Sequence, residues 1–282
     1  MRFGLLTSVL FLCVSAGLSA SCGGDDAITT SSGPSGPGGT GGAGGEGGSG
    51  SGGSGGGAAA TCAEPTPVAC ADAVIQQMNL KGDVAPGEIT NEADGAGFVS
   101  IIDATAGGFG AADPDAYVYG KFTATGLEKV AISDEDALES MDWDIAFRRY
   151  IMRINSGDSG PSCVTAARTV PGSTTYEALA AVPEGLKYNK DDYFTDDSCE
   201  LIPDGSGLEG SPATALSSYW TYPGCVAMTG NVFVLELRDG THLKLIVDGY
   251  YKDLDAQKQC NDTGTSGMAA GATMRVRWAM LP

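Results

Sequence analysis

The sequence predicts a mainly β protein, with a single β-rich domain over residues 62–282 and only a few short helices. Two observations lead to this fold class. Apolar and polar residues alternate with a period of two over several short segments bounded by Gly, Pro, Asp and Asn, which is the pattern of half-buried strands. About 220 residues of this kind also suit one domain with one core.

Strands are expected in the first half of the domain at residues 98–103, 116–123, 129–132 and 143–155. The last of these is the longest prediction. Tyr150 and Met152 would share one face of it, while Ile151 and Arg153 would share the other, because successive side chains of a strand point to opposite sides.

The clearest unit is a β-hairpin over residues 231–251, where Asp239-Gly240 separates two alternating runs. Asp-Gly is the strongest short-range signal for a two-residue hairpin turn. Such a turn would group Val232, Val234, Leu243, Leu245 and Val247 on one face, and Phe233, Leu235, Leu237, His242, Lys244 and Ile246 on the other. A closing strand is expected at residues 274–281.

Helices are expected at residues 71–80, 133–139 and 175–182. Ser133 and Asp136 have the spacing of a capping box. Pro183 would end the third helix, because proline disfavours the helical conformation of the residue before it.

The N-terminal 61 residues predict export and anchoring rather than a fold. Residues 1–21 have one early charge, an apolar core and small residues before Cys22, as in a secretory signal. The small residues ahead of Cys22 resemble a bacterial lipobox and predict lipidation there; the alternative is a soluble secreted protein. Residues 22–61 are rich in Gly and Ser and are expected to form a tether that cannot bury a core.

Six cysteines remain in the domain: Cys62, Cys70, Cys163, Cys199, Cys225 and Cys260. An even number in an exported domain predicts three disulfides with 15 possible connectivities. The sequential pairs 62 with 70, 163 with 199 and 225 with 260 are favoured, because near cysteines close with the least loop entropy. A zinc site is the competing interpretation, but the spacings do not match one.

Composition limits the possible functions. Sixteen Lys and Arg against 35 Asp and Glu give a net charge of −19, which opposes a nucleic-acid role. His242 is the single histidine, so neither a cluster of histidine ligands nor a two-histidine mechanism can form within one chain. A non-enzymatic protein is therefore expected.

Two segments have the residue types of a functional site. Residues 157–161 resemble the nucleophile segment of trypsin-like proteases, but no histidine precedes Ser159 as that family requires, so a polar turn is favoured. The acidic residues at 191–200 allow a calcium site, with a solvated acidic loop as the favoured alternative.

Arginine and methionine supply the remaining candidates. Arg148, Arg149 and Arg153 could bind carboxylates such as propionates, or pair internally with acidic neighbours. For a haem iron, the candidate ligands are Met152, Met228 and His242, because thioether and imidazole are established haem ligands; methionine as core filler is the alternative.

A family resemblance follows from four segments: WDIAFRR at residues 143–149, NSG at 155–157, YWTY at 219–222 and RVRWA at 275–279. Together with the hairpin they resemble the HmuY family of haem-binding lipoproteins, over about residues 97–282.

The resemblance implies a mainly β fold, a lipid anchor on the outer membrane, and capture of haem for delivery to a TonB-dependent receptor. Membrane contact would be through the anchor only. Members of that family hold iron through paired histidines or through methionines, and one histidine excludes the former pairing here. The alternative function is a surface lipoprotein that acts as a protein-interaction or adhesion module and has lost haem binding.

Overall fold

The computed structural model describes residues 62–282. The predicted signal at residues 1–21, the lipidation site Cys22 and the tether at residues 22–61 lie outside the described residues. Within the described part, no helix is both long and apolar enough to cross a membrane. The domain is mainly β, as predicted.

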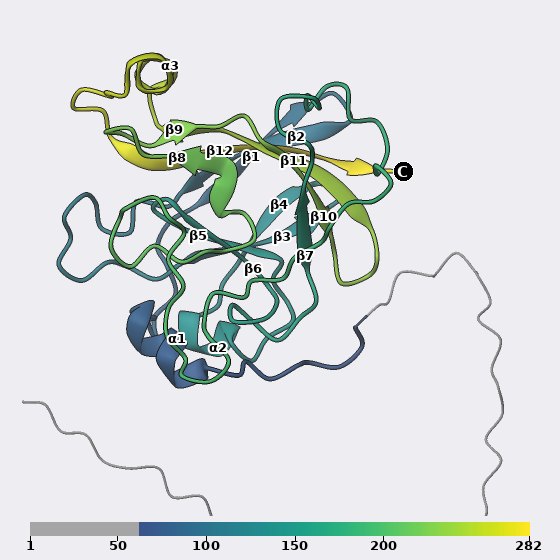
Figure 1. The fold of residues 1–282 in the computed structure, drawn as a ribbon, viewed down its shortest axis with the longest axis vertical. Helices are drawn as coiled ribbons and strands as arrows, with labels where there is room; N and C mark the ends of the chain where they lie inside the picture. Colours follow the sequence, from purple (N-terminus) through teal and green to yellow (C-terminus); the bar gives the residue numbers. More distant parts are fainter. Residues whose placement is uncertain (1–61) are drawn as a thin grey trace, which may run out of the picture. The chain divides into compact units, whose positions relative to one another are not determined.

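The larger of two main sheets has six strands in the order β1-β2-β12-β11-β10-β7, and all neighbours are antiparallel (Figure 1). These strands are β1 Ile89–Asp94, β2 Gly97–Asp103, β7 Thr165–Arg168, β10 Val232–Glu236, β11 His242–Tyr251 and β12 Gly271–Leu281. The two long strands β11 and β12 form the centre, so residues from the end of the chain pair with residues near its beginning.

The second sheet has four antiparallel strands in the order β4-β3-β5-β6. Its strands are β3 Val118–Thr123, β4 Gly126–Val130, β5 Ile145–Arg148 and β6 Ile151–Ile154. A small separate pair is formed by β8 Trp220–Thr221 and β9 Ala227–Met228.

The main core joins the two sheets. Phe233 and Leu245 of the large sheet belong to the same buried cluster as Phe147, Met152 and Ile154 of the small sheet. The other face of the small sheet is also covered, since Tyr119 of β3 and Trp143 pack in a second cluster with α1. Burial on both faces explains why all four residues of β5 are buried.

Three α-helices lie at opposite ends of the domain: α1 Ala71–Gln77 and α2 Asp134–Ala137 at one end, and α3 Leu254–Thr263 at the other (Figure 1). A 3-10 turn, η1 Ser217–Tyr219, precedes β8. The predicted cap of α2 is confirmed, because the Ser133 hydroxyl accepts the Asp136 backbone N–H. The helix α3 was not predicted, although Asp253 caps its start and Gly264 ends it in the left-handed conformation.

The helix predicted at residues 175–182 is absent from the structure, which has turns there. Backbone carbonyl groups of this segment accept hydrogen bonds from a side chain instead. The Lys244 ammonium group donates to the oxygens of Tyr176 and Leu179 at 2.7 and 2.9 Å, which a continuing helix would need for its own hydrogen bonds.

The single strand predicted at residues 143–155 is wrong. The segment is a hairpin, β5 and β6, with a turn at Arg149-Tyr150. Arg149 has φ of 54°, a left-handed conformation that turns the chain and cannot continue a strand.

The predicted register of the 231–251 hairpin is wrong by one residue, so the predicted grouping of its side chains on two faces is wrong as well. Val232 pairs with Ile246 and Glu236 with His242, whereas a two-residue turn at Asp239-Gly240 would pair Glu236 with Leu243. The connection is one residue longer, because Leu237 and Thr241 close a three-residue loop in which Gly240 has φ of 80°. A slip of one residue exchanges the faces of one whole strand relative to the other.

All six domain cysteines form disulfides, as predicted, but two of the three predicted pairs are wrong. Cys225–Cys260 is confirmed, whereas the others are Cys62–Cys163 and Cys70–Cys199. Loop entropy is a weak guide, because each doubling of loop length costs only about 0.6 kcal/mol. The fold brings distant segments together and so decides the partners.

Candidate functional site

The domain contains a groove of about 880 Å³, which is within the size range of small-molecule sites. It lies at the α3 end of the domain, where five separate segments and Leu208 meet: residues 105–109, 149–150, 222–226, 250–251 and 266–271.

The floor of the groove is held by the side chain of Gln257 on α3, which is 2% exposed. Its Oε1 accepts the backbone N–H groups of Tyr250 and Tyr251 at 2.7 and 3.3 Å, and its Nε2 donates to the Val226 oxygen at 3.0 Å. The Tyr251 hydroxyl in turn accepts the Val226 N–H at 3.0 Å. The disulfide Cys225–Cys260 ties the same loop to α3, so this side of the groove is preorganised.

Aromatic rings form the walls. Tyr150 stacks at 5.0 Å on Trp220, and Trp220 lies 6.3 Å from Tyr222 in an edge contact. Tyr250 and Tyr251 make a second edge contact at 5.1 Å. Such pairs expose flat, polarisable surfaces that suit a flat aromatic ligand.

One charge lines the groove. Arg149, at the β5–β6 turn, donates from Nη1 to the Gly108 oxygen at 2.6 Å, and its guanidinium lies 5.4 Å from the Phe109 ring centre. The groove-lining residues include no carboxylate, although the whole chain has a net charge of −19. The groove therefore favours an anionic group near Arg149.

Burial disfavours ionisation of two tyrosines of the groove, Tyr150 and Tyr250. Burial raises the pKa of the Tyr250 phenol to about 12, although the Arg149 guanidinium beside it acts in the opposite direction. Burial also raises the pKa of Tyr150. These phenols can donate hydrogen bonds while their rings pack against a ligand.

The rim carries two apolar side chains at loop tips. Phe109 and Met268 are 97% and 103% exposed, yet both line the groove. Glycines flank them, and Gly108 and Gly267 have positive φ, which lets each loop turn sharply. Two large apolar groups held in water next to a cavity are typical of a binding site.

Of the three arginines predicted to contact propionates, only Arg149 lines the groove. Arg148 donates to the backbone oxygens of Met78 and Asn79. Arg153 is fully buried and donates to Ser159 through its Nε and Nη2. Both also stack on the Tyr117 ring, at 4.1 and 4.8 Å, so the structure gives them interior partners.

The predicted iron ligands are not brought together. Met152 is 1% exposed inside the main core. Met228 lies on β9, two residues beyond the groove-lining Val226, and its backbone N–H bonds to Asn261. His242 begins β11, whereas Tyr250 and Tyr251 end that strand, about 30 Å away at the usual rise per residue. None of the three lines the groove.

The rejected protease-like segment holds a buried polar network. Ser159 is fully buried and donates to Asp191 Oδ2 at 2.6 Å. Asp191 also accepts the backbone N–H groups of Ile154 and Ala215, and burial raises its pKa to about 6. Asp191 therefore does not belong to a solvated acidic loop, as was predicted for residues 191–200; it links β6 to the loop before η1.

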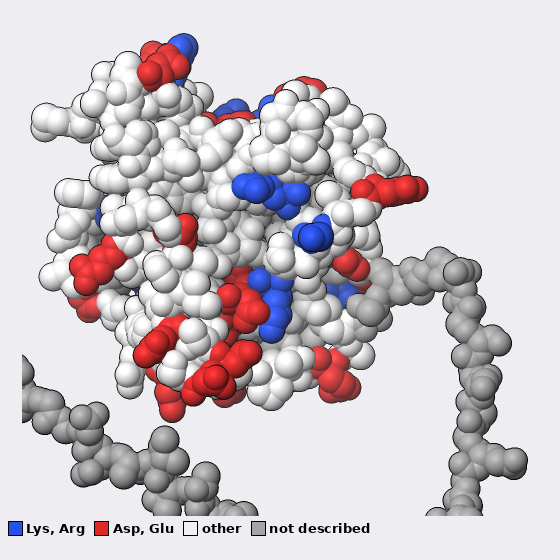
Figure 2. Space-filling view, in the orientation of Figure 1, with Lys and Arg blue, Asp and Glu red and all other residues white. Residues whose placement is uncertain are grey.

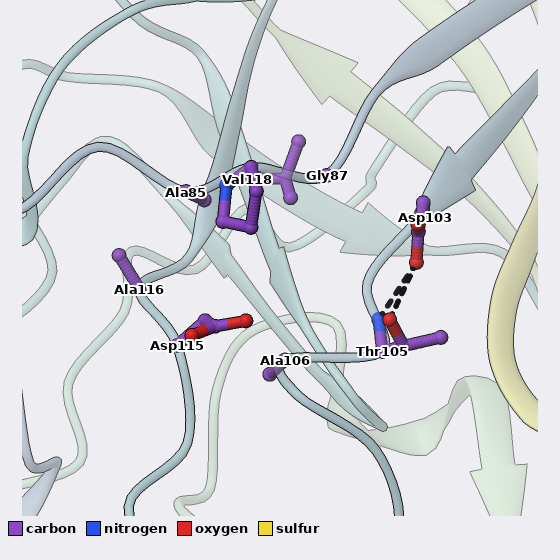
Figure 3. Close-up of a pocket in the computed structure, with 9 residues that line it drawn as sticks. Ala85, Gly87, Asp103, Thr105, Ala106, Asp115, Ala116 and Val118 are labelled. Atoms are coloured by element: carbon purple, nitrogen blue, oxygen red, sulfur yellow. Dashed lines mark hydrogen bonds between the residues drawn. The ribbon is translucent and has the colours of Figure 1, made fainter.

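A second, smaller cavity of about 80 Å³ lies beside Asp103 and Asp115 (Figure 3). It is too small for an organic ligand, and the Asp103 carboxylate accepts the N–H and hydroxyl of Thr105. No group of three or more metal-ligating side chains occurs within residues 62–282.

Figure 2 shows several acidic side chains gathered toward the end that carries α1 and α2, with basic side chains near the middle of this face and both kinds of charge at α3.

Sequence reasoning missed the groove tyrosines Tyr150, Tyr222, Tyr250 and Tyr251, the rim residues Phe109 and Met268, and Gln257. A partial signal was available for the rim, because both residues are large apolar groups inside glycine-rich turns.

The HmuY family model matches residues 113–263, and no curated protein matches. Solved structures that match include a protein described as an HmuY-like heme-binding protein from Bacteroides vulgatus. It has 20% sequence identity, the match covers 65% of this chain and 91% of that chain, and the TM-score is 0.39. A protein described as a lipoprotein from Bacteroides fragilis has 14% identity, covers 66% and 92%, and has TM-score 0.39. The apo HmuY analog of Tannerella forsythia has 17% identity, covers 71% and 99%, and has TM-score 0.36. Because the family model matches more than half of the sequence, the chain belongs to the HmuY family.

Proposed function

We propose that this chain binds haem in the groove and does so as a non-enzymatic protein. The observation that carries the proposal is the lining of the groove: aromatic walls, one guanidinium and no carboxylate, in a protein of net charge −19. Family membership supports the same function.

Haem fits this chemistry on two counts. Its flat apolar ring would replace water against the tyrosine rings, and burial of apolar area is favourable by roughly 25 cal/mol per Å². Its propionates would pair with Arg149, which is the residue retained from the three predicted propionate contacts.

The iron ligands Met152, Met228 and His242 remain predictions, and their placement outside the groove does not favour them. Met268 is the methionine that lines the groove, and thioether is a haem ligand type.

The cellular role follows from the family and the N-terminal sequence. We propose a lipid anchor at Cys22, attachment to the outer membrane through that anchor only, and delivery of captured haem to a TonB-dependent receptor. A tether over residues 22–61 would let the domain reach about 30–35 Å from its anchor.

Haemin titration of the purified full chain tests the binding function. A saturable one-to-one Soret shift at micromolar protein is expected, and Arg149→Gln should weaken it roughly tenfold, the loss of one charge-assisted contact. Arg168→Gln is the matched control, because Arg168 is exposed on β7 and does not line the groove. A shift that does not saturate would disprove haem binding.

A protein-interaction module is the second candidate, favoured by the exposed side chains of Phe109 and Met268. Retention of a defined protein partner by the chain, lost in Phe109→Ala and unaffected by haemin, would favour this role over the first.

A further inference from the structure

We infer, on the basis of the proposed function, that the groove recognises the porphyrin ring and its carboxylates rather than the iron, so that its ligands include iron-free porphyrins. The inference rests on which chemical groups the groove presents and on where the potential iron ligands lie.

The ring contacts come first. Tyr150 and Tyr222 flank Trp220 on one side, and Tyr250 and Tyr251 form the floor. Tyr150, Tyr250 and Tyr251 are preorganised by contacts that need no ligand: the Tyr219 hydroxyl donates to the Tyr150 backbone oxygen at 2.6 Å, and Gln257 holds the backbone of Tyr250 and Tyr251. Contacts with a flat ring are therefore formed without reorganisation.

The carboxylate contact comes second. Arg149 is fixed at both ends, because its backbone N–H donates to the Ala104 oxygen at 2.7 Å and its Nη1 donates to the Gly108 oxygen. A guanidinium has five N–H donors, so others are free to bind an anion. A porphyrin carries its carboxylates with or without metal.

Iron coordination is poorly provided for in comparison. Burial raises the pKa of the Tyr250 phenol to about 12, so this phenol stays protonated, and a protonated phenol is a weak ligand for a cation. His242 lies near the far end of β11, and Met152 is enclosed in the core. Met268 is fully exposed at a loop tip, so fixing its thioether on iron would cost the freedom of a flexible side chain.

The test compares haemin with protoporphyrin IX by quenching of tryptophan fluorescence in the full chain, since Trp220 stacks on the groove-lining Tyr150. We expect the two dissociation constants to agree within about tenfold, the range that one weak additional contact changes. Saturable haemin binding with protoporphyrin more than tenfold weaker overturns this inference alone. Protoporphyrin binding without haemin binding upholds it and overturns the proposed function, and binding of neither overturns both.

Two variants separate ring and carboxylate recognition from metal recognition. Met268→Leu keeps the volume and removes the thioether, and it should change both affinities less than about threefold. A larger loss of affinity for haemin alone would show that coordination of the iron by Met268 governs binding. Arg149→Gln should weaken protoporphyrin IX roughly tenfold but its dimethyl ester hardly at all, whereas equal losses for both would contradict the carboxylate contact. Arg168→Gln is again the control.

Discussion

The side-chain oxygen of Gln257 accepts the backbone N–H of Tyr250 at 2.7 Å, and this bond joins α3 to the strand that forms the floor of the groove. The same amide reaches Tyr251 and Val226. Three backbone groups from two segments thus depend on one buried side chain, which makes Gln257 a positioning residue for the site.

Gln257→Leu should therefore loosen the groove. It leaves two N–H groups and one carbonyl without their partner, and buried unpaired groups cost about 1–3 kcal/mol each. We expect the free energy of unfolding in urea to fall by at least about 3 kcal/mol and haemin affinity to fall as well. Gln259→Leu, at an exposed position of the same helix, should change neither. Unchanged stability of the Gln257 variant would contradict the assigned role.

The disulfides should differ in their effect on the site. The disulfide Cys225–Cys260 closes a loop with a sequence separation of 35, and replacing both cysteines by serine should lower the free energy of unfolding by about 4 kcal/mol. For Cys62–Cys163 the separation is 101, and the expected loss is about 5 kcal/mol. Only the first pair touches the groove, through Cys225. Haemin titration at a temperature where both variants are folded should show weaker binding for the Cys225/Cys260 variant alone. Equal affinities would show that this disulfide only stabilises the fold.

Stability should rise as the pH falls from 7.5 to 5. Burial raises the pKa of Asp191 and of Asp144 to about 6, from an unfolded value of 3.8. Between these values the folded chain retains protons that the unfolded chain has lost, so stability decreases as pH rises through this window. The two groups together should contribute roughly 2–3 kcal/mol more at pH 5 than at pH 7.5.

Urea denaturation at both pH values checks this. Asp191→Asn should remove about half of the difference, because Asp144 keeps the other half, while Asp197→Asn, at an exposed position, should leave it intact. A stability that rises with pH over this range would contradict the assignment.

Much of the fold could be predicted because strand periodicity is a local property. Residues 98–103 are a strand and residues 231–251 contain a hairpin, as predicted. The errors arose where one backbone angle decides the outcome. The left-handed Arg149 turned a predicted strand into a hairpin, and one additional loop residue, Arg238, changed which side chains of β10 and β11 share a face.

The groove could not be predicted in the same way. It is formed by residues as far apart as Thr105 and Gly271, and periodicity within a segment says nothing about contacts between segments. Of the three predicted arginines only Arg149 lines the groove, because it lies at the turn while Arg148 and Arg153 point into the interior. To predict the groove, one would first have to know the large sheet, in which strands from distant parts of the sequence pair with one another.

The last prediction concerns Gly271, where β12 passes behind the groove floor. A Cβ added there would lie 2.5 Å from Tyr250 Cε1 and 3.2 Å from its hydroxyl, so Gly271→Ala must displace the ring, the movable part of that side chain. We expect overpacking to cost about 1–3 kcal/mol and haemin affinity to fall, because Tyr250 lines the groove and its ring would no longer lie where the ligand packs. Gly249→Ala is the matched control: its added Cβ comes no closer than 3.5 Å to any atom, an ordinary contact, so fluorescence titration should give the unaltered affinity. If Gly271→Ala binds haemin as tightly as the unaltered chain, Tyr250 does not border the ligand, and the groove is not the site.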